Sequence, residues 1–265
     1  MGRIRRYVFR LGVAVLLAGG LACGWAYAEP EKPASVTESR SWRTAPRHSA
    51  GIAPDPVAYA AEAIVQVYVA ATYGWRGIFA VHPWIIYKRS GETSFTRYEV
   101  VGWRGSTVVQ RNYALPDGLW YGAVPNLLVD QRGEGVELLI EQIETAIKRY
   151  PYADTYRSYP GPNSNTFMAH IGREVPGLRL DLPATAIGKD YRPVDDPVGV
   201  SSSGRGWQVS LFGLLGVSVG LEEGLELNFL GLHFGVDLNR PALRLPIVGR
   251  LGANDVRVPD SAAGH

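Results

Sequence analysis

The alternation of apolar and polar residues predicts an antiparallel β-meander in the first part of the folded region. Each predicted strand is rich in β-branched or aromatic residues and is bounded by a turn that contains glycine. The predicted strands cover residues 63–69, 78–88, 95–103 and 108–113, with turns at 74–77 and 90–92. The connections are too short to hold a crossover helix, so neighbouring strands must run antiparallel.

Two stretches have the period of an amphipathic helix. The first covers residues 136–150, where Leu138, Leu139, Ile143 and Ile147 form one apolar face and Pro151 follows the end. The second is expected to begin at Ser164 or Asn165 and to end near residue 173, with Asn163 as its N-cap. Strands followed by helices predict an α+β fold.

The last third of the chain is glycine-rich and strongly apolar. Leu225, Leu227 and Phe229 alternate with polar residues, and the alternation resumes from Leu230 after a shift of phase. We therefore expect a C-terminal β-ribbon with a bulge at the shift, after a turn at 222–224. Packing against the core is the favoured role for its apolar residues, and contact with a partner or a membrane surface is the alternative.

The N-terminus has the pattern of an export signal. Four arginines precede an uncharged apolar stretch at 11–22, which is too short to span a membrane as a helix, and Ala26-Tyr27-Ala28 resembles a cleavage site. Soluble export and a retained N-terminal anchor are both favoured over lipidation of Cys23, and a retained anchor would associate the protein with the membrane. The expected location is accordingly the periplasm or the membrane surface. Cys23 is the single cysteine, so no disulfide framework is expected.

These patterns divide the chain into five parts. We expect a signal or anchor at 1–28, a flexible linker at 29–56, the α+β domain at 57–195, the C-terminal ribbon at 196–252 and a tail at 253–265. Four of the 27 basic residues and none of the 25 acidic ones precede Glu29, so the remainder carries 23 basic and 25 acidic residues and a net charge of −2. No stripe of basic and aromatic residues indicates nucleic-acid binding. No metal-ligand or phosphate-loop motif occurs, so neither a cofactor nor a metal is expected.

Ser164 is a candidate nucleophile. It follows Pro160-Gly161-Pro162-Asn163, which is a rigid turn, and the start of a helix favours negative charge. An alkoxide or an oxyanion would be stabilised at such a place. Serine and asparagine are also ordinary helix caps, and from the local sequence alone capping is the favoured interpretation.

His82 is a candidate general base, and Glu99 is the candidate that would orient it. His82 lies in an apolar strand, where a polar group needs a partner, and Pro83 suggests a sheet edge. Glu99 lies on the next predicted strand and faces the histidine if the two strands pair. The competing interpretations are a histidine bonded to backbone and an ion pair of Glu99 with Arg97 or Arg104, and we favour the ion pair for Glu99.

Three segments carry a family resemblance: His82-Pro83-Trp84-Ile85, residues 98–103 and residues 161–167. Together they resemble an uncharacterised bacterial family, a domain of unknown function. They also resemble the circularly permuted branch of the NlpC/P60 papain-like superfamily, which includes lecithin:retinol acyltransferase-like proteins. There, a strand supplies a histidine and a helix opens with an asparagine-cysteine pair, which Asn163-Ser164 matches with serine in place of cysteine.

The resemblance implies a permuted papain-like domain that acts on peptide or acyl bonds of the cell envelope. Ser164 would attack, His82 would accept the proton, Glu99 would orient the imidazole, and backbone N–H groups of Ser164 and Asn165 would hold the oxyanion. A serine hydroxyl needs a better-placed base than a thiol does. The alternative is an inactive fold that binds an envelope glycan, peptide or lipid. The expected substrate-binding residues are Asn163, Asn165, Trp84 and Trp103, and other stacking faces are Trp75, Trp120 and Tyr121.

Overall fold

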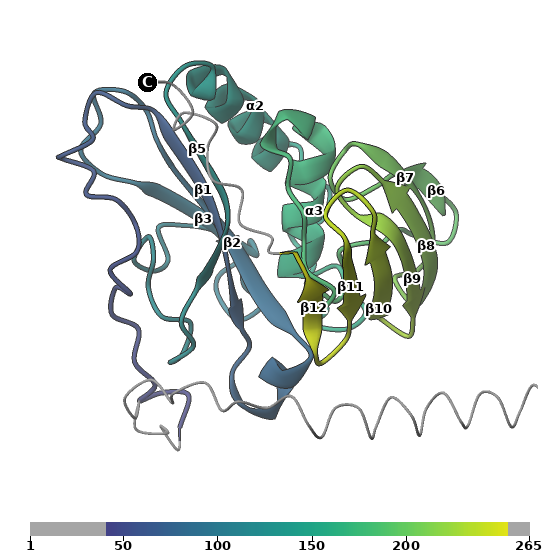
Figure 1. Cartoon of the computed structure of the whole chain (residues 1–265). Coiled ribbons are helices and arrows are strands. Elements are labelled where there is room, and N and C mark those ends of the chain that lie inside the picture. The colour runs from purple at the N-terminus through teal and green to yellow at the C-terminus, as the bar shows by residue number, and fades with distance from the viewer. Residues whose placement is uncertain (1–40, 254–265) are drawn as a thin grey trace, which may run out of the picture. The chain divides into compact units, whose positions relative to one another are not determined.

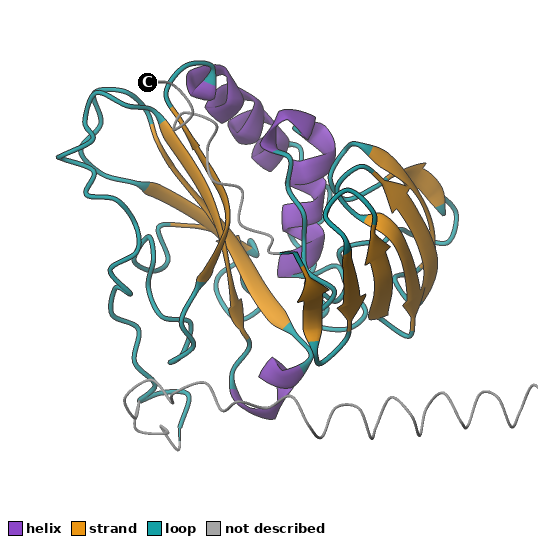
Figure 2. Ribbon diagram, in the orientation of Figure 1, coloured by secondary structure: helices purple, strands orange, loops and turns teal. Residues whose placement is uncertain are grey.

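The computed structural model describes residues 41–253, and these residues form an α+β fold (Figures 1 and 2). Within them lie two antiparallel sheets and two α-helices, which confirms the predicted class. No helix of the described part is long and apolar enough to cross a membrane. The predictions for residues 1–28, for Cys23 and for the tail beyond residue 253 lie outside the described residues.

The first sheet is the predicted meander with one additional strand. Its order is β4-β3-β2-β1-β5. The strands are β1 (Ile64–Ala71), β2 (Val81–Lys88), β3 (Thr96–Val100), β4 (Val109–Arg111) and β5 (Asn126–Arg132). Sequence analysis did not predict β5, which pairs with β1 on the side opposite β2. The predicted turn at 74–77 is a 3₁₀ helix, η1 (Gly74–Ile78).

Both predicted helices are present. Helix α2 (Val136–Lys148) buries Leu139, Ile140 and Ile143 and ends shortly before Pro151. The prediction that Leu138 lies on the same apolar face is wrong, because Leu138 is 60% exposed. Helix α3 (Ser164–Glu174) begins at the predicted residue, with Asn163 as its N-cap, and the 3₁₀ helix η2 (Pro176–Leu178) follows it.

The first sheet is apolar on both faces. On one face, Ile85 and Tyr87 of β2 pack with the buried side of α2 and α3. On the other face, Trp84 and Ile86 of the same strand pack with Trp120, which comes from the loop before β5. Successive side chains of a strand point to opposite faces, so the parity of a position in β2 decides which core it joins.

The second sheet contains seven short strands in the order β12-β11-β10-β9-β8-β7-β6. They are β6 (Val198–Val200), β7 (Gly206–Leu211), β8 (Leu215–Gly220), β9 (Gly224–Phe229), β10 (Leu232–Asp237), β11 (Ala242–Leu245) and β12 (Gly249–Gly252). The predicted bulge is wrong, because the shift of phase is the two-residue hairpin turn Leu230-Gly231 between β9 and β10. Both turn residues have positive φ, 52° and 77°, as a type I′ turn requires.

The apolar side chains of the second sheet point outward, so the prediction that they pack against the core is also wrong. Leu225, Leu227 and Phe229 of β9 are each about half exposed, whereas Glu226 and Asn228 between them are buried. The sheet lies beside α3, whose Arg173 donates to the Val200 carbonyl in β6 at 3.2 Å (Figure 1). Its inner face is therefore polar.

Part of the predicted linker contacts the domain. Ser49 pairs with Gly118 in an isolated β-bridge, and its hydroxyl donates to the Asp117 carboxylate at 2.7 Å. The backbone N–H groups of Ile52 and Ala53 donate to the same carboxylate. These bonds lower the pKa of Asp117 although burial alone would raise it. Asp117 thus fixes residues 49–53 to the loop that also carries Trp120.

Candidate functional site

His82 and Glu99 form a hydrogen bond on the face of the first sheet that lies opposite the two helices. His82 Nε2 and Glu99 Oε2 are 2.8 Å apart, and both side chains are buried. Glu99 also accepts from Arg97, whose Nε lies 2.7 Å from Oε1 and whose NH2 nitrogen lies 3.1 Å from Oε2. The predicted contact with the histidine and the competing ion pair with Arg97 are therefore both present.

Strand pairing explains why these residues meet. Ile85 of β2 faces Tyr98 of β3, which places Glu99 beside Trp84 and diagonal to His82 on the same face. Arg97 lies two residues from Glu99 on that face, and its guanidinium covers the Trp84 ring at 4.1 Å. Arg97 also donates to the Leu115 carbonyl at 2.6 Å, which ties the network to the loop before β5.

The charges in this network are balanced when the histidine is neutral. Burial lowers the pKa of the His82 imidazole below its ordinary value, and the hydrogen bond to Glu99 opposes this effect only in part. Burial alone would raise the pKa of Glu99, but the hydrogen bond from His82 and the charge of Arg97 together lower it. Glu99 is therefore the anion, Arg97 the cation, and neutral His82 donates from Nε2. This tautomer leaves Nδ1 with a lone pair.

An aromatic cluster covers the histidine and extends to the surface. The Trp120 ring stacks on the His82 ring, with centroids 3.6 Å apart and planes within 4°. Trp103 lies 6.2 Å from Trp120 and is 55% exposed. The centroid of the Tyr121 ring lies 5.0 Å from that of Trp120 and 6.3 Å from that of Trp103. We call Trp103, Trp120, Tyr121 and Tyr113 the aromatic cluster; its outermost large ring is Trp103.

Ser164 lies at the start of α3, on the helical side of the first sheet. The buried residues of α3 pack with Ile85, in the core that His82 does not join. Within the described residues, no hydrogen bond connects Ser164 to His82 or to Glu99. The structure therefore brings together two of the three predicted catalytic residues, and the role of Ser164 as a nucleophile stays a prediction.

The N–H groups at the start of α3 are already engaged by the cap. Asn163 Oδ1 accepts from the backbone N–H groups of Asn165 at 2.9 Å and Thr166 at 3.2 Å. Thr166 Oγ1 accepts from the Asn163 N–H at 3.1 Å, which completes a capping box. Asn165, which was expected to hold an oxyanion through its N–H, donates that group to the cap.

The predicted substrate-binding residues differ in exposure. Asn163 and Asn165 are buried, and both donate their amide groups to the Ile187 carbonyl, at 3.0 and 2.9 Å. Trp84 is fully buried and donates to the Pro116 carbonyl at 2.8 Å. Of the four, only Trp103 presents a large surface to solvent. Trp75, on η1, is 71% exposed and packs on Phe79.

Two other histidines have structural contacts. His170 Nε2 lies 2.9 Å from the Ala146 carbonyl of α2. His233 is buried in β10, and its Nε2 lies 3.6 Å from Asp190. Among residues 41–253, no group of His, Cys, Asp and Glu side chains is arranged to hold a metal ion.

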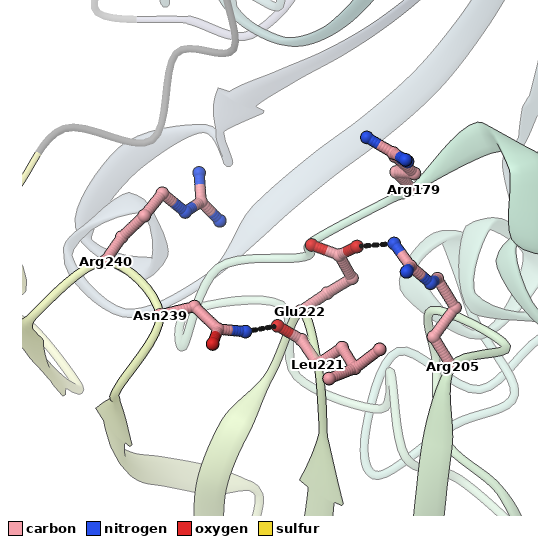
Figure 3. A pocket seen from close by; sticks show the side chains of 6 residues that line it. All are labelled: Arg179, Arg205, Leu221, Glu222, Asn239 and Arg240. Carbon is pink, nitrogen blue, oxygen red and sulfur yellow. Dashed lines mark hydrogen bonds and ion pairs between the residues drawn. The ribbon is translucent and has the colours of Figure 1, made fainter.

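Sequence analysis missed a basic pocket at one end of the second sheet (Figure 3). The pocket has a volume of about 310 Å³ and is lined by Arg179, Arg205, Leu221, Glu222, Asn239 and Arg240. Its residues come from the end of η2, where Arg179 is the C-cap, and from turns that are far apart in sequence, which is why no local motif indicated it. It is a second candidate site, separate from His82.

The family model described as "Protein of unknown function (DUF3750)" matches residues 62–191. This segment is a DUF3750 domain. It confirms the resemblance to an uncharacterised bacterial family, and it runs from the residues before β1 to Tyr191, past α3. Comparisons with curated proteins and with solved structures give no significant match. The papain-like resemblance of the DUF3750 domain therefore stays a prediction, and the second sheet lies beyond the matched segment.

Proposed function

We propose that the DUF3750 domain is a ligand-binding module of the cell envelope and that its ligand stacks on the aromatic cluster. The observation that carries this proposal is the position of Trp103, which is 55% exposed while its ring packs against Trp120 and Tyr121. A large apolar ring held rigidly at the surface is typical of a binding face. The His82–Glu99–Arg97 network would then be the buried support beneath Trp120.

The chemistry around the cluster favours a glycan that bears acidic groups. Arg47 lies over the Tyr121 ring at 4.1 Å, and Arg104 lies over the Tyr113 ring at 5.0 Å. Both arginines keep their charge while stacked, so they can pair with a carboxylate of the ligand. The apolar face of a sugar ring can lie against Trp103. Envelope glycans with acidic peptide or sugar groups combine these two features.

Binding is favoured over acyl transfer for three reasons. Strand parity places His82 on the face opposite α3, whereas Ser164 lies on α3. The Asn165 N–H, which the acyl-transfer mechanism needs for the oxyanion, is bonded to Asn163 at 2.9 Å. The Trp120 ring covers one face of the imidazole at 3.6 Å. A base that reaches no nucleophile lacks the geometry of a triad.

Titration of the full chain with peptidoglycan fragments, followed by calorimetry, tests this proposal. We expect Trp103→Ala to weaken binding by at least about fivefold, because truncation of a central aromatic contact costs more than about 1 kcal/mol. Trp207→Ala is the matched control, since Trp207 is 68% exposed but lies on the second sheet. Absence of glycan binding, or an equal loss in both variants, would refute the proposal.

The second candidate is a serine hydrolase or acyltransferase, and the His82–Glu99 bond of 2.8 Å is the observation in its favour. A fluorophosphonate probe, which reacts with activated serines, tests it. If the domain is a binding module, the folded protein is not labelled. Labelling that disappears in Ser164→Ala and in His82→Ala, with both variants still folded, would establish the enzyme in place of the binding module.

A further inference from the structure

The second sheet exposes only apolar side chains from its strands. They come from all seven strands of the sheet, and we call this set the outer face: Val198, Val200, Trp207, Val209, Leu211, Leu215, Val217, Val219, Leu225, Leu227, Phe229, Phe234, Val236, Leu243 and Leu251. Each of them is between 38% and 68% exposed. Exposed leucine, isoleucine and valine also occupy the turns at both ends of the strands, at positions 221, 230, 238, 247 and 248.

The inner face carries polar and charged side chains that are already paired, so the sheet cannot bury its apolar face in their place. Glu226 of β9 is buried and pairs with Lys189 at 2.8 Å and with Arg244 of β11 at 3.1 Å. Asn228 donates to Asp190 at 2.7 Å. A soluble antiparallel sheet normally buries its apolar face and exposes its polar one. Here the polar face is committed to the contact with the DUF3750 domain, because Lys189 and Asp190 belong to that domain.

The outer face is too large to be an ordinary solvent-exposed patch. The largest apolar patch of a monomeric protein covers about 300–600 Å². Fifteen large side chains, each more than a third exposed and spread over seven neighbouring strands, exceed that area. An apolar surface of this size is expected to be an interaction site that another molecule buries.

A lipid surface fits the outer face better than a protein does. Protein interfaces surround an apolar centre with a polar rim and form a hydrogen bond for about every 100–200 Å². The outer face offers no charged or hydrogen-bonding side chain except the indole N–H of Trp207. Tryptophan, like tyrosine, is enriched at the boundary between membrane and water.

The charges that a membrane surface requires lie at one end of the strands, in the basic pocket. Three arginines and the carboxylate of Glu222 line this pocket (Figure 3). Arg205 pairs with Glu222, and Arg240 pairs with Asp181 at 3.1 Å. The Arg179 side chain has no hydrogen bond or ion pair within the described residues, and it is exposed. Leu221 belongs both to the pocket and to the apolar turns, which connects the two surfaces. Trp207 follows Arg205 by two residues, at the same end of the sheet.

We propose that the outer face binds the surface of a bilayer containing anionic phospholipid, with a headgroup phosphate between Arg179, Arg205 and Arg240. The apolar side chains enter the boundary between headgroups and acyl chains, as the apolar face of an interfacial protein does. The guanidinium groups lie at the level of the phosphates, where bidentate hydrogen bonds hold them. This inference does not depend on the glycan-binding proposal, because the two surfaces lie on different sheets.

A fluorophore placed on the outer face tests the proposal in the full chain. An environment-sensitive nitrobenzoxadiazole label is attached at Leu227→Cys in a Cys23→Ser background. The matched control carries the label at Leu138→Cys, because Leu138 is 60% exposed but lies on α2. We expect vesicles of phosphatidylcholine and phosphatidylglycerol to shift the emission at 227 to the blue and to leave the emission at 138 unchanged. Attachment through the N-terminal segment alone would shift neither label.

A charge variant and a mass measurement complete the test. Arg179→Gln is expected to weaken binding to the anionic vesicles by about fivefold, since a basic residue near an anionic surface contributes about 1 kcal/mol. Binding to vesicles of phosphatidylcholine alone should change little. An unshifted emission at 227 with vesicles would overturn the proposal. So would a two-chain mass by light scattering together with emission at 227 that is already blue-shifted without lipid, because a second copy would then cover the face.

Discussion

The two sheets of this protein use the same alternation of side chains for opposite purposes. In the first sheet both faces of β2 are buried, and the polar residues His82, Glu99 and Arg97 form one compensated network within an apolar layer. In the second sheet the polar side chains form the buried layer and the apolar ones face outward. The polarity of a strand position therefore does not by itself say whether the position is buried.

The difference follows from what each sheet packs against. The apolar faces of α2 and α3 cover one side of the first sheet, and the loop that carries Trp120 packs on the other. Burial there therefore removes hydrocarbon from water. The second sheet packs on Asp181, Lys189 and Asp190, so its inner face must supply opposite charges and hydrogen-bond partners. The apolar side chains then have only the outward direction left.

The largest loss of stability is expected from a substitution of Arg244 in β11. This buried guanidinium contacts Asp181, Glu226 and Asp237. Removing it takes one basic partner from each of three buried carboxylates, which keep only Arg240, Lys189 and Arg250, so Arg244→Ala is expected to reduce the free energy of unfolding by about 3–5 kcal/mol. Leu243→Ala, one residue earlier on the outer face, should cost less than about 1 kcal/mol. Urea unfolding of the two variants measures the difference, and equal losses would show that the inner polar layer does not hold the sheet in place.

The corresponding change in the first sheet is Glu99→Gln. It leaves the buried Arg97 guanidinium without its anion, and we expect a loss of about 3 kcal/mol in the free energy of unfolding. The matched control is Glu137→Gln, because Glu137 pairs with Arg89 at 3.1 Å at the surface and such pairs contribute only about 0–1 kcal/mol. A loss at Glu99 no larger than at Glu137 would contradict the view that the network is a buried, compensated unit.

A smaller effect distinguishes capping from catalysis at the start of α3. Asn163→Ala removes the acceptor for two backbone N–H groups, and should cost about 1 kcal/mol in the free energy of unfolding. Ser164→Ala should cost less, because the buried Ser164 side chain accepts neither of the two N–H groups that Asn163 caps. Thermal and urea unfolding measure both values. A larger loss in Ser164→Ala than in Asn163→Ala would contradict the assignment of the cap.

The two sheets also share a dependence of stability on pH. Burial lowers the pKa of His82 in the first sheet and of His233 in the second below the ordinary value of 6.5. The unfolded chain therefore binds protons below about pH 6.5 that the folded protein does not, and stability present above that pH is lost on acidification. Each such proton changes the slope by up to about 1.4 kcal/mol per pH unit.

The free energy of unfolding, measured from pH 7.5 to pH 5, tests this expectation. His82→Gln should give a shallower slope than the natural sequence, whatever its effect at neutral pH. An unchanged slope in His82→Gln would show that the imidazole is not held neutral by burial.

Local sequence patterns predicted most of the helices and strands, but they did not predict which face of the second sheet is buried. The meander, α2, α3 and the Asn163 cap follow from residue periodicity and cap chemistry, which act within a few residues. The hairpin at Leu230-Gly231 was mistaken for a bulge because a leucine in the left-handed region is uncommon. The outward direction of the apolar ribbon was missed because alternation fixes which residues share a face and not which face is covered.

In the candidate site, too, contacts between neighbouring strands could be predicted, and contacts that depend on the packing of distant segments could not. The contact between His82 and Glu99 could be predicted because it needs only the pairing of two neighbouring strands. The relation of His82 to Ser164 depends on which side of the sheet the helices cover, and no local signal in the sequence gives that side. The basic pocket joins Arg179 to turns between strands that come much later in the chain, so it too required the structure.

The most direct test of the central claim, the reversed polarity of the second sheet, is the reactivity of two adjacent cysteines in the lipid-free protein. Val217 of β8 is 43% exposed and Ser218 is 9% exposed. We predict that Val217→Cys reacts rapidly with a maleimide in the folded protein, and that Ser218→Cys, a nearly isosteric change, reacts only after unfolding, both in the Cys23→Ser background. Rapid reaction at 218 with protection at 217 would contradict the account, because the sheet would then bury its apolar face.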